Sequence, residues 1–535
     1  MVQDLRIIVA QINTTVGDFT GNRQKIEQVW REQDSNADLI IYPEMVLSGY
    51  PVEDLVLRPA FIERAQKEID AIIEHSKQHS SAILIGAPWK IDDSLYNAAF
   101  LIDRGKVSII LKHGLPNYGV FDEKRIFEHG PFPVPTSFRG RKLGIMICWD
   151  FWSPEASAHL KEKGAEILII PNGSTYEITK IPARLHEAEQ RVRETGLPVL
   201  YVNMIGGQDE LIFDGTSFYM NEQGEVTFMM KAFEEHIALV QQEGDPIPYP
   251  EIDKAIYSAC VLGLRDYVEK NNISGVLLGL SGGIDSALAA VMAVDAFGSD
   301  RVKAYRLPSP FTSTESMADA QALAEKLGIF LGTIPIEGMM KAYEEAIEGL
   351  SGLAHENIQA RIRGGILMSL SNMSGDMLLS TGNKSEVAVG YSTLYGDMCG
   401  GFNPLKDLYK QKVFALSHLR NRWKPDFVHG SEGPLIPADI LTKAPTAELR
   451  EGQLDQDSLP PYEELDQILE ALIENERSID DIADAGFSKD MVEKVYRLLK
   501  LSEYKRRQAA PGVNVTTKSF GGRSRRYPIV NKFSE

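Results

Sequence analysis

The chain has 535 residues, with 56 lysines and arginines against 75 aspartates and glutamates, so its formal net charge is −19 with histidines counted as neutral. Hydrophobic residues make up 43% and charged residues 24%, a globular composition that excludes wholesale disorder. A surface that coats nucleic acid or an anionic membrane needs excess Lys and Arg, so we expect neither as a partner. Any anionic ligand must be met by local cations.

The cysteines and the hydropathy pattern narrow the class further. Cys148, Cys260 and Cys399 lie far apart, without a CxxC or Cys/His cluster, which predicts neither a disulfide framework nor a zinc site. No window approaches 18 uncharged apolar residues, and the first residues contain no basic leader. We therefore expect a cytoplasmic protein without a membrane span.

The first half alternates short aliphatic runs with longer amphipathic stretches. Arg58 to His79 and Pro182 to Thr195 are predicted helices, which together with the strands indicate a layered α/β domain. The segment 243–253, with three prolines and four acids, is typical of a connector. We place the first domain at 1–245 and a linker at 246–253. Seven runs predict buried strands: RIIVAQI, ADLIIYP, AILIGAP, VSIILK, KLGIMIC, AEILIIP and PVLYVN.

The second half, residues 254–535, begins with a strand, a Gly-rich loop and a helix in the strings SGVLLGL, SGGIDS and ALAAVMAVDAFG. Strand-like and helix-like strings continue to alternate as far as DMLLSTG, which predicts a parallel sheet with helices on both faces. After Leu459 the pattern is mostly helical and ends in a loop-like basic tail. The whole chain is thus predicted to contain two α/β units and a helical C-terminal region.

The Gly-rich loop, Gly279 to Ser286, can direct backbone N–H groups and a helix N-terminus at an anion. The lysine of a Walker A motif is absent, which disfavours an ordinary P-loop kinase or GTPase. Asp285 would repel a phosphate unless a divalent cation lies between them. For SGG alone, a strand-to-helix turn with Asp285 as the N-cap is the simpler interpretation.

The full SGGIDS string resembles the pyrophosphate loop of the N-type ATP pyrophosphatases, which cleave ATP to AMP and diphosphate while they activate a carboxylate or carbonyl. Four later strings, ENIQARIRG, STGNKSE, STLYGD and KAPTAEL, resemble the NAD synthetase family. The resemblance implies a Rossmann-like domain that adenylates nicotinic acid adenine dinucleotide (deamido-NAD) and amidates it to NAD. The family's PSAEL string reads PTAEL here and keeps a hydroxyl at Thr446.

The same resemblance implies a set of ligand contacts in the second half. Mg²⁺ would be held by Asp285 and Glu386. Taken singly, charged residues such as Arg361 and Glu386 are more simply explained as surface ion pairs. Deamido-NAD would be bound by Asn357, Arg361, Glu386, Asp397 and Lys505. ATP would be bound by Gly279, Leu280, Ser281, Gly282, Gly283, Ile284, Asp285, Ser286, Leu307, Thr381, Lys410 and Thr446.

Amidation requires ammonia, and free ammonium at neutral pH is protonated and not nucleophilic, so we expect a glutaminase in the first half. Glu44, Lys112 and Cys148 each end a predicted strand, where side chains of parallel strands can converge on one sheet edge. Lys112 would stabilise the Cys148 thiolate and the oxyanion, and Glu44 would relay protons. An isolated cysteine at a strand end is more often a buried core thiol.

PEMVLSGYP, LKHGLPNYGVFDEKR and ICWDFWSPE resemble the three active-site segments of the nitrilase superfamily, which implies an α-β-β-α sandwich. A nitrilase unit ahead of an NAD synthetase unit is the arrangement of the glutamine-dependent NAD synthetase family. By this resemblance the glutamine site comprises Tyr118, Ser174 and Lys180, with Glu123 supporting Lys112. It also implies an internal ammonia tunnel and homo-oligomers built from synthetase-domain dimers, in some members octamers.

Two positions depart from the family's pattern. In place of the usual Cys-Glu-Asp, this chain has Trp149 after the cysteine, and in place of the usual Ser-Pro-Tyr it has Thr175 in the middle.

The basic tail, Lys505 to Lys532, holds eight cations and no acid, and we expect part of it to close over the dinucleotide phosphates. Two alternative functions are weighed against this one. The first is an amidotransferase for another substrate, which the NIQAR and YGD strings disfavour. The second is a catalytically silent RNA-binding protein, which the intact catalytic residues disfavour.

Overall fold

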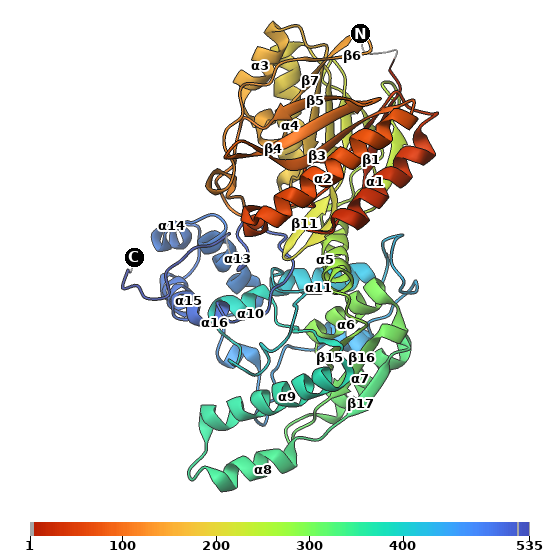
Figure 1. The fold of residues 1–535 in the computed structure, drawn as a ribbon. Coiled ribbons are helices and arrows are strands. Elements are labelled where there is room, and N and C mark those ends of the chain that lie inside the picture. Colours follow the sequence, from red (N-terminus) through yellow and green to blue (C-terminus); the bar gives the residue numbers. More distant parts are fainter. Residues whose placement is uncertain (1–4, 522–523, 534–535) are drawn as a thin grey trace. The chain divides into compact units, whose positions relative to one another are not determined.

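The computed structural model describes residues 5–521 and 524–533 and divides the chain into two compact units, Met1–Pro250 and Glu251–Glu535 (Figure 1). Helix α5 begins at Ile252, so it includes the last two residues of the predicted linker 246–253. Among the described residues, no helix has the length and apolar character that a membrane crossing requires.

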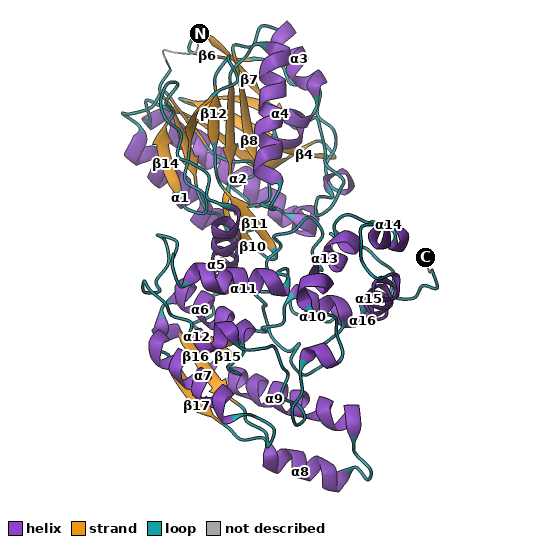
Figure 2. Cartoon of the chain, turned by 180° about the vertical axis from the view of Figure 1, so that it is seen from behind, coloured by secondary structure: helices purple, strands orange, loops and turns teal. Residues whose placement is uncertain are grey.

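Two six-stranded sheets form the centre of the first unit (Figure 2). The first sheet has the order β14-β1-β2-β3-β4-β5 and the second β13-β12-β9-β8-β7-β6, while β10 and β11 form a separate hairpin. The strands are β1 Ile7–Gln11, β2 Leu39–Ile41, β3 Ala82–Ile91, β4 Ser94–Asp103, β5 Lys106–Leu111, β6 Thr136–Phe138, β7 Arg141–Ile145, β8 Ile167–Asn172, β9 Val199–Asn203, β10 Ile205–Gln208, β11 Leu211–Asp214, β12 Phe218–Met220, β13 Val226–Met229 and β14 His236–Leu239.

The two sheets pack face to face and helices cover their outer faces. One core cluster joins strands of both sheets, and two others join each sheet to its own helix pair. Helix α2 covers a sheet because it has one apolar stripe: its buried residues Ile62, Ala65, Ile69 and Ile72 recur at helical spacing. The predicted α-β-β-α sandwich is confirmed. The four helices are α1 Phe19–Gln33, α2 Pro59–His75, α3 Pro154–Glu162 and α4 Lys180–Thr195.

All seven predicted strands of the first unit form, but one of them is not buried. VSIILK forms most of β5, an edge strand of the first sheet that ends at Leu111, and only Ile110 of that strand is buried. Ile109 on its other face is 45% exposed. The prediction of burial was wrong there because an aliphatic run also suits an edge strand, which has a neighbour on one side only.

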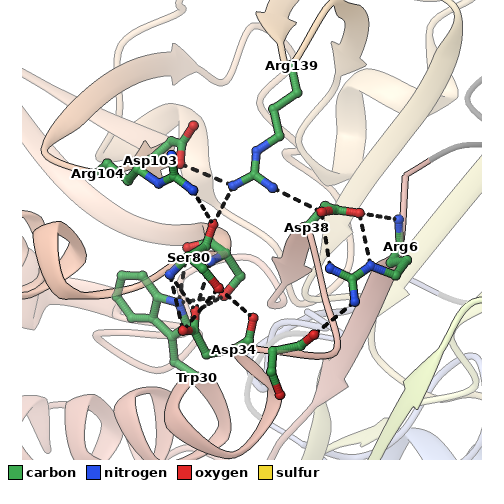
Figure 3. A network of polar contacts seen from close by, with 10 residues as sticks. Arg6, Trp30, Asp34, Asp38, Ser80, Asp103, Arg104 and Arg139 are labelled. Carbon is green, nitrogen blue, oxygen red and sulfur yellow. Dashed lines mark hydrogen bonds and ion pairs between the residues drawn. The ribbon is translucent and has the colours of Figure 1, made fainter.

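At the amino ends of the parallel strands, a polar network joins the two sheets (Figure 3). Asp38, just before β2, accepts from the backbone N–H of Arg6, just before β1, at 2.9 Å. Arg139, in the turn between β6 and β7, lies 3.0 Å from Asp38 and donates to the carbonyl of Ser80 at 2.6 Å. Asp34 accepts from the backbone N–H groups of Ser80 and Ser81. These contacts hold the two sheets together at the edge opposite to the strand ends that carry Glu44 and Cys148.

The second unit contains a four-stranded parallel sheet in the order β17-β16-β15-β18. Because the order reverses at β15, right-handed crossovers place α6 and α7 on one face and α9 on the other, as predicted. The loop after β15 therefore stands at the reversal point, where α/β sheets bind ligands. The elements here are β15 Val276–Gly279, β16 Val302–Arg306, β17 Phe330–Thr333, β18 Met377–Leu378, α5 Ile252–Lys270, α6 Ile284–Phe297, α7 Thr314–Leu327, α8 Glu337–Ala346, α9 Gly352–Ser374 and α11 Lys410–Arg420.

The C-terminal helices have an apolar core of their own. That core includes Val387 and Ala388 of α10, which joins the helical region to the loop after β18. The predicted helical region after Leu459 is thus present (Figure 2). The remaining helices are α10 Lys384–Val389, α12 Ala438–Thr442, α13 Tyr462–Ile473, α14 Ile479–Asp484, α15 Lys489–Leu501 and α16 Glu503–Arg506.

Candidate active sites

In the first unit, Lys112 lies between two buried carboxylates. Its Nζ is 2.7 Å from Glu44 Oε1 and 2.7 Å from Glu123 Oε2, and all three side chains are nearly inaccessible to solvent. Burial alone would lower the pKa of Lys112, but Glu123 and Glu44 outweigh it and hold that pKa well above its usual range. Burial and the neighbouring Glu44 also raise the pKa of Glu123. Lys112 is therefore a fixed positive charge at the centre of this site.

Cys148 is held in a tight turn beside this cluster. It begins the 3₁₀ turn Cys148–Trp152 with φ of +46°, a left-handed conformation that is uncommon and strained for a residue other than glycine. Burial, followed by the charge of Glu44, raises the pKa of the thiol well above its usual range, although Lys112 acts in the opposite direction. The charge of Lys112 thus acts on the thiol in the direction that favours the thiolate, against the larger effect of burial.

The predicted convergence on a single sheet edge is wrong. Glu44 follows β2 and Lys112 follows β5 in the first sheet, whereas Cys148 follows β7 in the second. The sheets meet at this point, since Glu44 Oε2 accepts from the N–H of Gly173, just after β8, at 2.8 Å. The spacing of strand ends along the chain does not show which sheet each strand joins. The sequence alone could therefore not assign Cys148 to a different sheet from Glu44 and Lys112.

Three residues that position this cluster escaped the sequence reasoning. Asn97 Nδ2 donates to Glu44 Oε1 at 2.7 Å, and the Tyr50 hydroxyl donates to Glu123 Oε1 at 3.0 Å. Asp150 accepts from the backbone N–H groups of Gly114 and Ile147, and burial raises its pKa to about 6. Tyr50 and Asp150 lie inside the quoted nitrilase-like strings, while Asn97 lies in the middle of β4 and carries no local signal.

The residues expected to bind glutamine gather around an aromatic group. Lys180 Nζ lies 5.8 Å from the ring centroid of Tyr118 and 5.3 Å from that of Trp152. The ring of Trp149 is 4.7 Å from that of Tyr118. Ser174 is held differently, because its Oγ accepts from Arg184 Nε at 3.1 Å.

Arg184 organises the segment that carries Ser174 and Thr175, and it too was missed. Its guanidinium forms a fully buried ion pair with Asp214 at 2.8 Å and donates to the carbonyls of Ser174 and Thr175. The departure at Thr175 therefore leaves this segment anchored through its backbone. An arginine on the buried face of a helix, such as Arg184 on α4, indicates that a buried acid must be near.

In the second unit, the loop after β15 opens onto a cavity of about 340 Å³. Gly282 has φ of +83°, and a Cβ there would lie 2.4 Å from the carbonyl oxygen of Ser316, so only glycine fits. The N-cap of α6 is Gly283 and Asp285 stands in the first turn, so the simple turn with Asp285 as N-cap is not formed. The cavity lining includes most of the predicted ligand residues: Gly279, Leu280, Ser281, Gly283, Ile284, Asp285, Ser286, Leu307, Thr381, Glu386, Asp397, Lys410 and Thr446.

The two predicted metal ligands share one lysine. Lys410 Nζ is 2.5 Å from Asp285 Oδ2 and 3.2 Å from Glu386 Oε1. Burial raises the pKa of Glu386 to about 7 despite the opposing charge of Lys410, while the two carboxylates together raise the pKa of Lys410. Within the described ranges no group of three or more His, Cys, Asp or Glu could hold a metal ion. Two carboxylates beside a Gly-rich loop at a helix N-terminus nevertheless suit Mg²⁺, which takes one or two carboxylates together with substrate phosphates.

The other residues expected to bind the dinucleotide contact the segment 390–397, part of which lines the cavity. Lys505 Nζ donates to the carbonyls of Gly390 and Ser392 at 2.8 and 2.7 Å. Asn357 accepts from Thr393 Oγ1 at 2.9 Å, and Arg361 Nε donates to a carbonyl of the same segment at 3.3 Å. Asp397, the last residue of the segment, lines the cavity, and burial raises its pKa to about 6.

Two further cavity residues, Lys443 and Glu448, belong to the KAPTAEL string but were not singled out. Lys443 Nζ donates to Ser316 Oγ at 2.6 Å, and Glu448 accepts from Ser316 Oγ at 2.7 Å.

The basic tail packs against the helical region. Arg525 forms a 2.6 Å ion pair with Glu503, and Arg523 lies outside the described residues.

Comparison with known proteins gives matches to both units. The carbon-nitrogen hydrolase family matches residues 6–244 and the NAD synthase family matches residues 256–509. A glutamine-dependent NAD(+) synthetase of Rhodobacter capsulatus is 46% identical with all of both chains covered, and one of Acinetobacter baylyi is 42% identical over 99% of each.

Solved structures agree over the same length. The glutamine-dependent NAD+ synthetase of Acinetobacter baumannii in complex with ADP has a TM-score of 0.78, 40% identity and 98% coverage of both chains. A glutamine-dependent NAD(+) synthetase of Cytophaga hutchinsonii has a TM-score of 0.84 with 98% coverage of both chains. At 22% identity, that second structure supports the fold alone.

Proposed function

The chain belongs to the glutamine-dependent NAD(+) synthetase family, and from this premise we propose that it converts deamido-NAD to NAD. The reaction consumes ATP and takes its nitrogen from L-glutamine, so the other products are AMP, diphosphate and L-glutamate. The full-length match carries this proposal, since it spans both the Glu44, Lys112, Cys148 site and the SGGIDS cavity.

In the first unit, Glu44 takes the proton of the Cys148 thiol as the sulfur adds to the amide carbon of glutamine. The Lys112 ammonium stabilises the oxyanion that forms, and its charge is secured by Glu44 and Glu123. Glu44 returns the proton to the leaving ammonia, which leaves a thioester on Cys148. A water molecule, deprotonated by Glu44, then releases glutamate and regenerates the thiol. Tyr118, Ser174 and Lys180 bind the glutamine.

In the second unit, backbone N–H groups of the loop 279–286 and the N-terminus of α6 hold the ATP phosphates. The nicotinate carboxylate adds to the α-phosphorus and diphosphate leaves, which gives an acyl-adenylate. Ammonia then attacks the acyl carbon and AMP leaves. Asn357, Arg361, Asp397 and Lys505 position the dinucleotide through the segment 390–397.

We propose that Asp285 and Glu386 hold Mg²⁺ in this cavity. When bound, the ion neutralises phosphate charge and so favours departure of diphosphate. Lys410 offsets part of the negative charge of the two carboxylates, and a bound divalent cation would offset the rest, which would make the site compatible with an anionic ligand.

We also propose a cytoplasmic location and a homo-oligomer assembled through the second unit, in accord with the family resemblance. Light scattering on the purified chain should give a mass of at least two chains, and a monomer at micromolar concentration would refute the oligomer.

The reaction itself can be tested by product analysis. Incubation with deamido-NAD, ATP, Mg²⁺ and L-glutamine should yield NAD, AMP, diphosphate and glutamate in equal amounts. Omission of deamido-NAD should remove AMP and diphosphate. Formation of ADP and phosphate, or of glutamate without NAD in the complete mixture, would contradict the proposal.

A further inference from the structure

Near Cys148, the side chains of Tyr118, Trp149, Trp152, Glu177 and Lys180 form a group that we call the rim. Lys180 Nζ lies over the rings of Tyr118 and Trp152. It makes no ion pair or hydrogen bond with any residue within 5–521 and 524–533. Partial burial lowers the pKa of this lysine. A desolvated cation is costly unless something compensates it, so this position suits an anionic group of a ligand.

A carboxylate stands on the same segment. Glu177 is three residues before Lys180, whose backbone N–H donates to the Glu177 carbonyl at 3.0 Å. Its side chain is partly buried and accepts a long hydrogen bond, 3.4 Å, from Thr179 Oγ1. The Glu177 charge acts on both Tyr118 and Lys180, since it opposes the lowering of the Lys180 pKa and contributes to the raised pKa of Tyr118. The rim therefore presents both signs of charge, and the two groups form no ion pair with each other.

The aromatic neighbour of these charges is the residue that departs from the family's pattern. Trp149 takes the place of the usual glutamate, and its ring lies 4.7 Å from Tyr118 and 5.8 Å from Trp152. The rim thus lacks a carboxylate at position 149. Glu177 is a carboxylate whose charge contributes to the raised pKa of Tyr118.

We infer that Glu177 binds the α-ammonium group of glutamine while Lys180 binds its α-carboxylate, with the rings of Tyr118 and Trp149 enclosing the head group. The inference rests on the proposed function, because it names how the glutaminase unit recognises its substrate. A carboxylate and an ammonium on one rim match the two charges of an α-amino acid, and aromatic faces favour a bound ammonium. Glu177 is therefore a specificity residue that selects L-α-amino acid amides over amides without an α-ammonium.

The test compares L-glutamine with glutaramate, which has the same amide and carboxylate but no α-amino group. In the full chain, Glu177→Gln should raise the KM for L-glutamine about 10- to 100-fold, the effect of losing one charge-assisted hydrogen bond, and leave kcat within about threefold. Hydrolysis of glutaramate should stay at the wild-type rate, which also shows that the first unit is folded. Glu189→Gln, which removes a surface carboxylate paired with Arg193, is the matched control and should change neither substrate.

A rescue separates recognition from local structure. Trp149→Glu combined with Glu177→Gln returns a carboxylate to the rim and should recover at least tenfold of the lost glutamine affinity. An unchanged KM in Glu177→Gln, or an equal loss with glutaramate, would overturn the inference. The proposed function fails separately, if the wild-type chain releases no glutamate from glutamine.

Discussion

Each unit contains a buried lysine between two carboxylates, and the two arrangements differ in what surrounds them. Lys112 and its partners Glu44 and Glu123 are enclosed, with side chains 0%, 0% and 6% exposed. Lys410 is equally buried, but Asp285 and Glu386 are 18% and 19% exposed and face the cavity. In the first unit the ammonium and its carboxylates are closed to solvent, and we propose the ammonium as the catalytic charge. In the second unit the ammonium offsets part of the charge of two carboxylates that also face the cavity.

The largest expected effect follows from removing the enclosed lysine. Lys112→Met leaves two carboxylates buried without a counter-charge, so the free energy of unfolding of the first unit should fall by about 3–5 kcal/mol. Glutamine hydrolysis should be lost to background, because no cation remains to stabilise the oxyanion. Denaturant unfolding and glutamate release measure the two effects.

Lys106→Met is the matched control for Lys112→Met, because it makes the same change at the exposed start of the same strand. It should leave stability within about 0.5 kcal/mol of the wild type. Equal stability of Lys112→Met and the control would break the proposed distinction between the enclosed and the cavity-facing lysine.

Removing the cavity-facing lysine should cost less stability. Lys410→Met leaves Asp285 and Glu386 where water or a cation can reach them, so the unfolding free energy should fall by only about 1–2 kcal/mol. Ammonium-dependent NAD synthesis should fall at least tenfold, since the local positive charge around the phosphates is lost. Lys412→Met, two residues along α11, serves as the control, and an activity loss of the same size there would contradict the role given to Lys410.

The smallest effect is expected in the network of Figure 3, at the sheet edge opposite to the strand ends that carry Glu44 and Cys148. Hydrogen bonds from Ser81 and Ser80 lower the pKa of Asp34 to about 2, although its partial burial acts in the opposite direction. A lowered folded-state pKa stabilises the fold above the unfolded pKa near 4, and this stabilisation is lost as the pH falls toward 2.

Asp34→Asn should accordingly destabilise the first unit by about 1 kcal/mol at pH 7 and progressively less below pH 4, with glutaminase activity unchanged. Urea unfolding across this pH range measures the difference. A destabilisation that stays constant down to pH 2 would show that the Asp34 charge is not its source.

Much of the fold and of both sites could be predicted from local patterns. The aliphatic runs predicted the strands, and the SGGIDS string predicted the loop after β15, because both kinds of local structure depend on residues that are neighbours in the sequence. The family resemblance assigned Glu44, Lys112, Glu123 and Cys148 to one site, but most individual contacts between distant segments could not be predicted. Lys410 and Asp285 are 125 positions apart, and Asn97 and Glu44 are 53 apart. Only the packing of sheets and helices brings such pairs together.

The central claim is that the two units perform separate halves of one reaction, and Cys148→Ala tests it most directly. NAD synthesis by this variant is measured with L-glutamine and, in parallel, with a high concentration of ammonium salt. We predict that glutamine-supported synthesis falls at least about 1,000-fold, because the nucleophile is absent. Ammonium-supported synthesis should stay within about twofold of the wild type. Loss of both activities, or retention of the glutamine-supported one, would contradict the account.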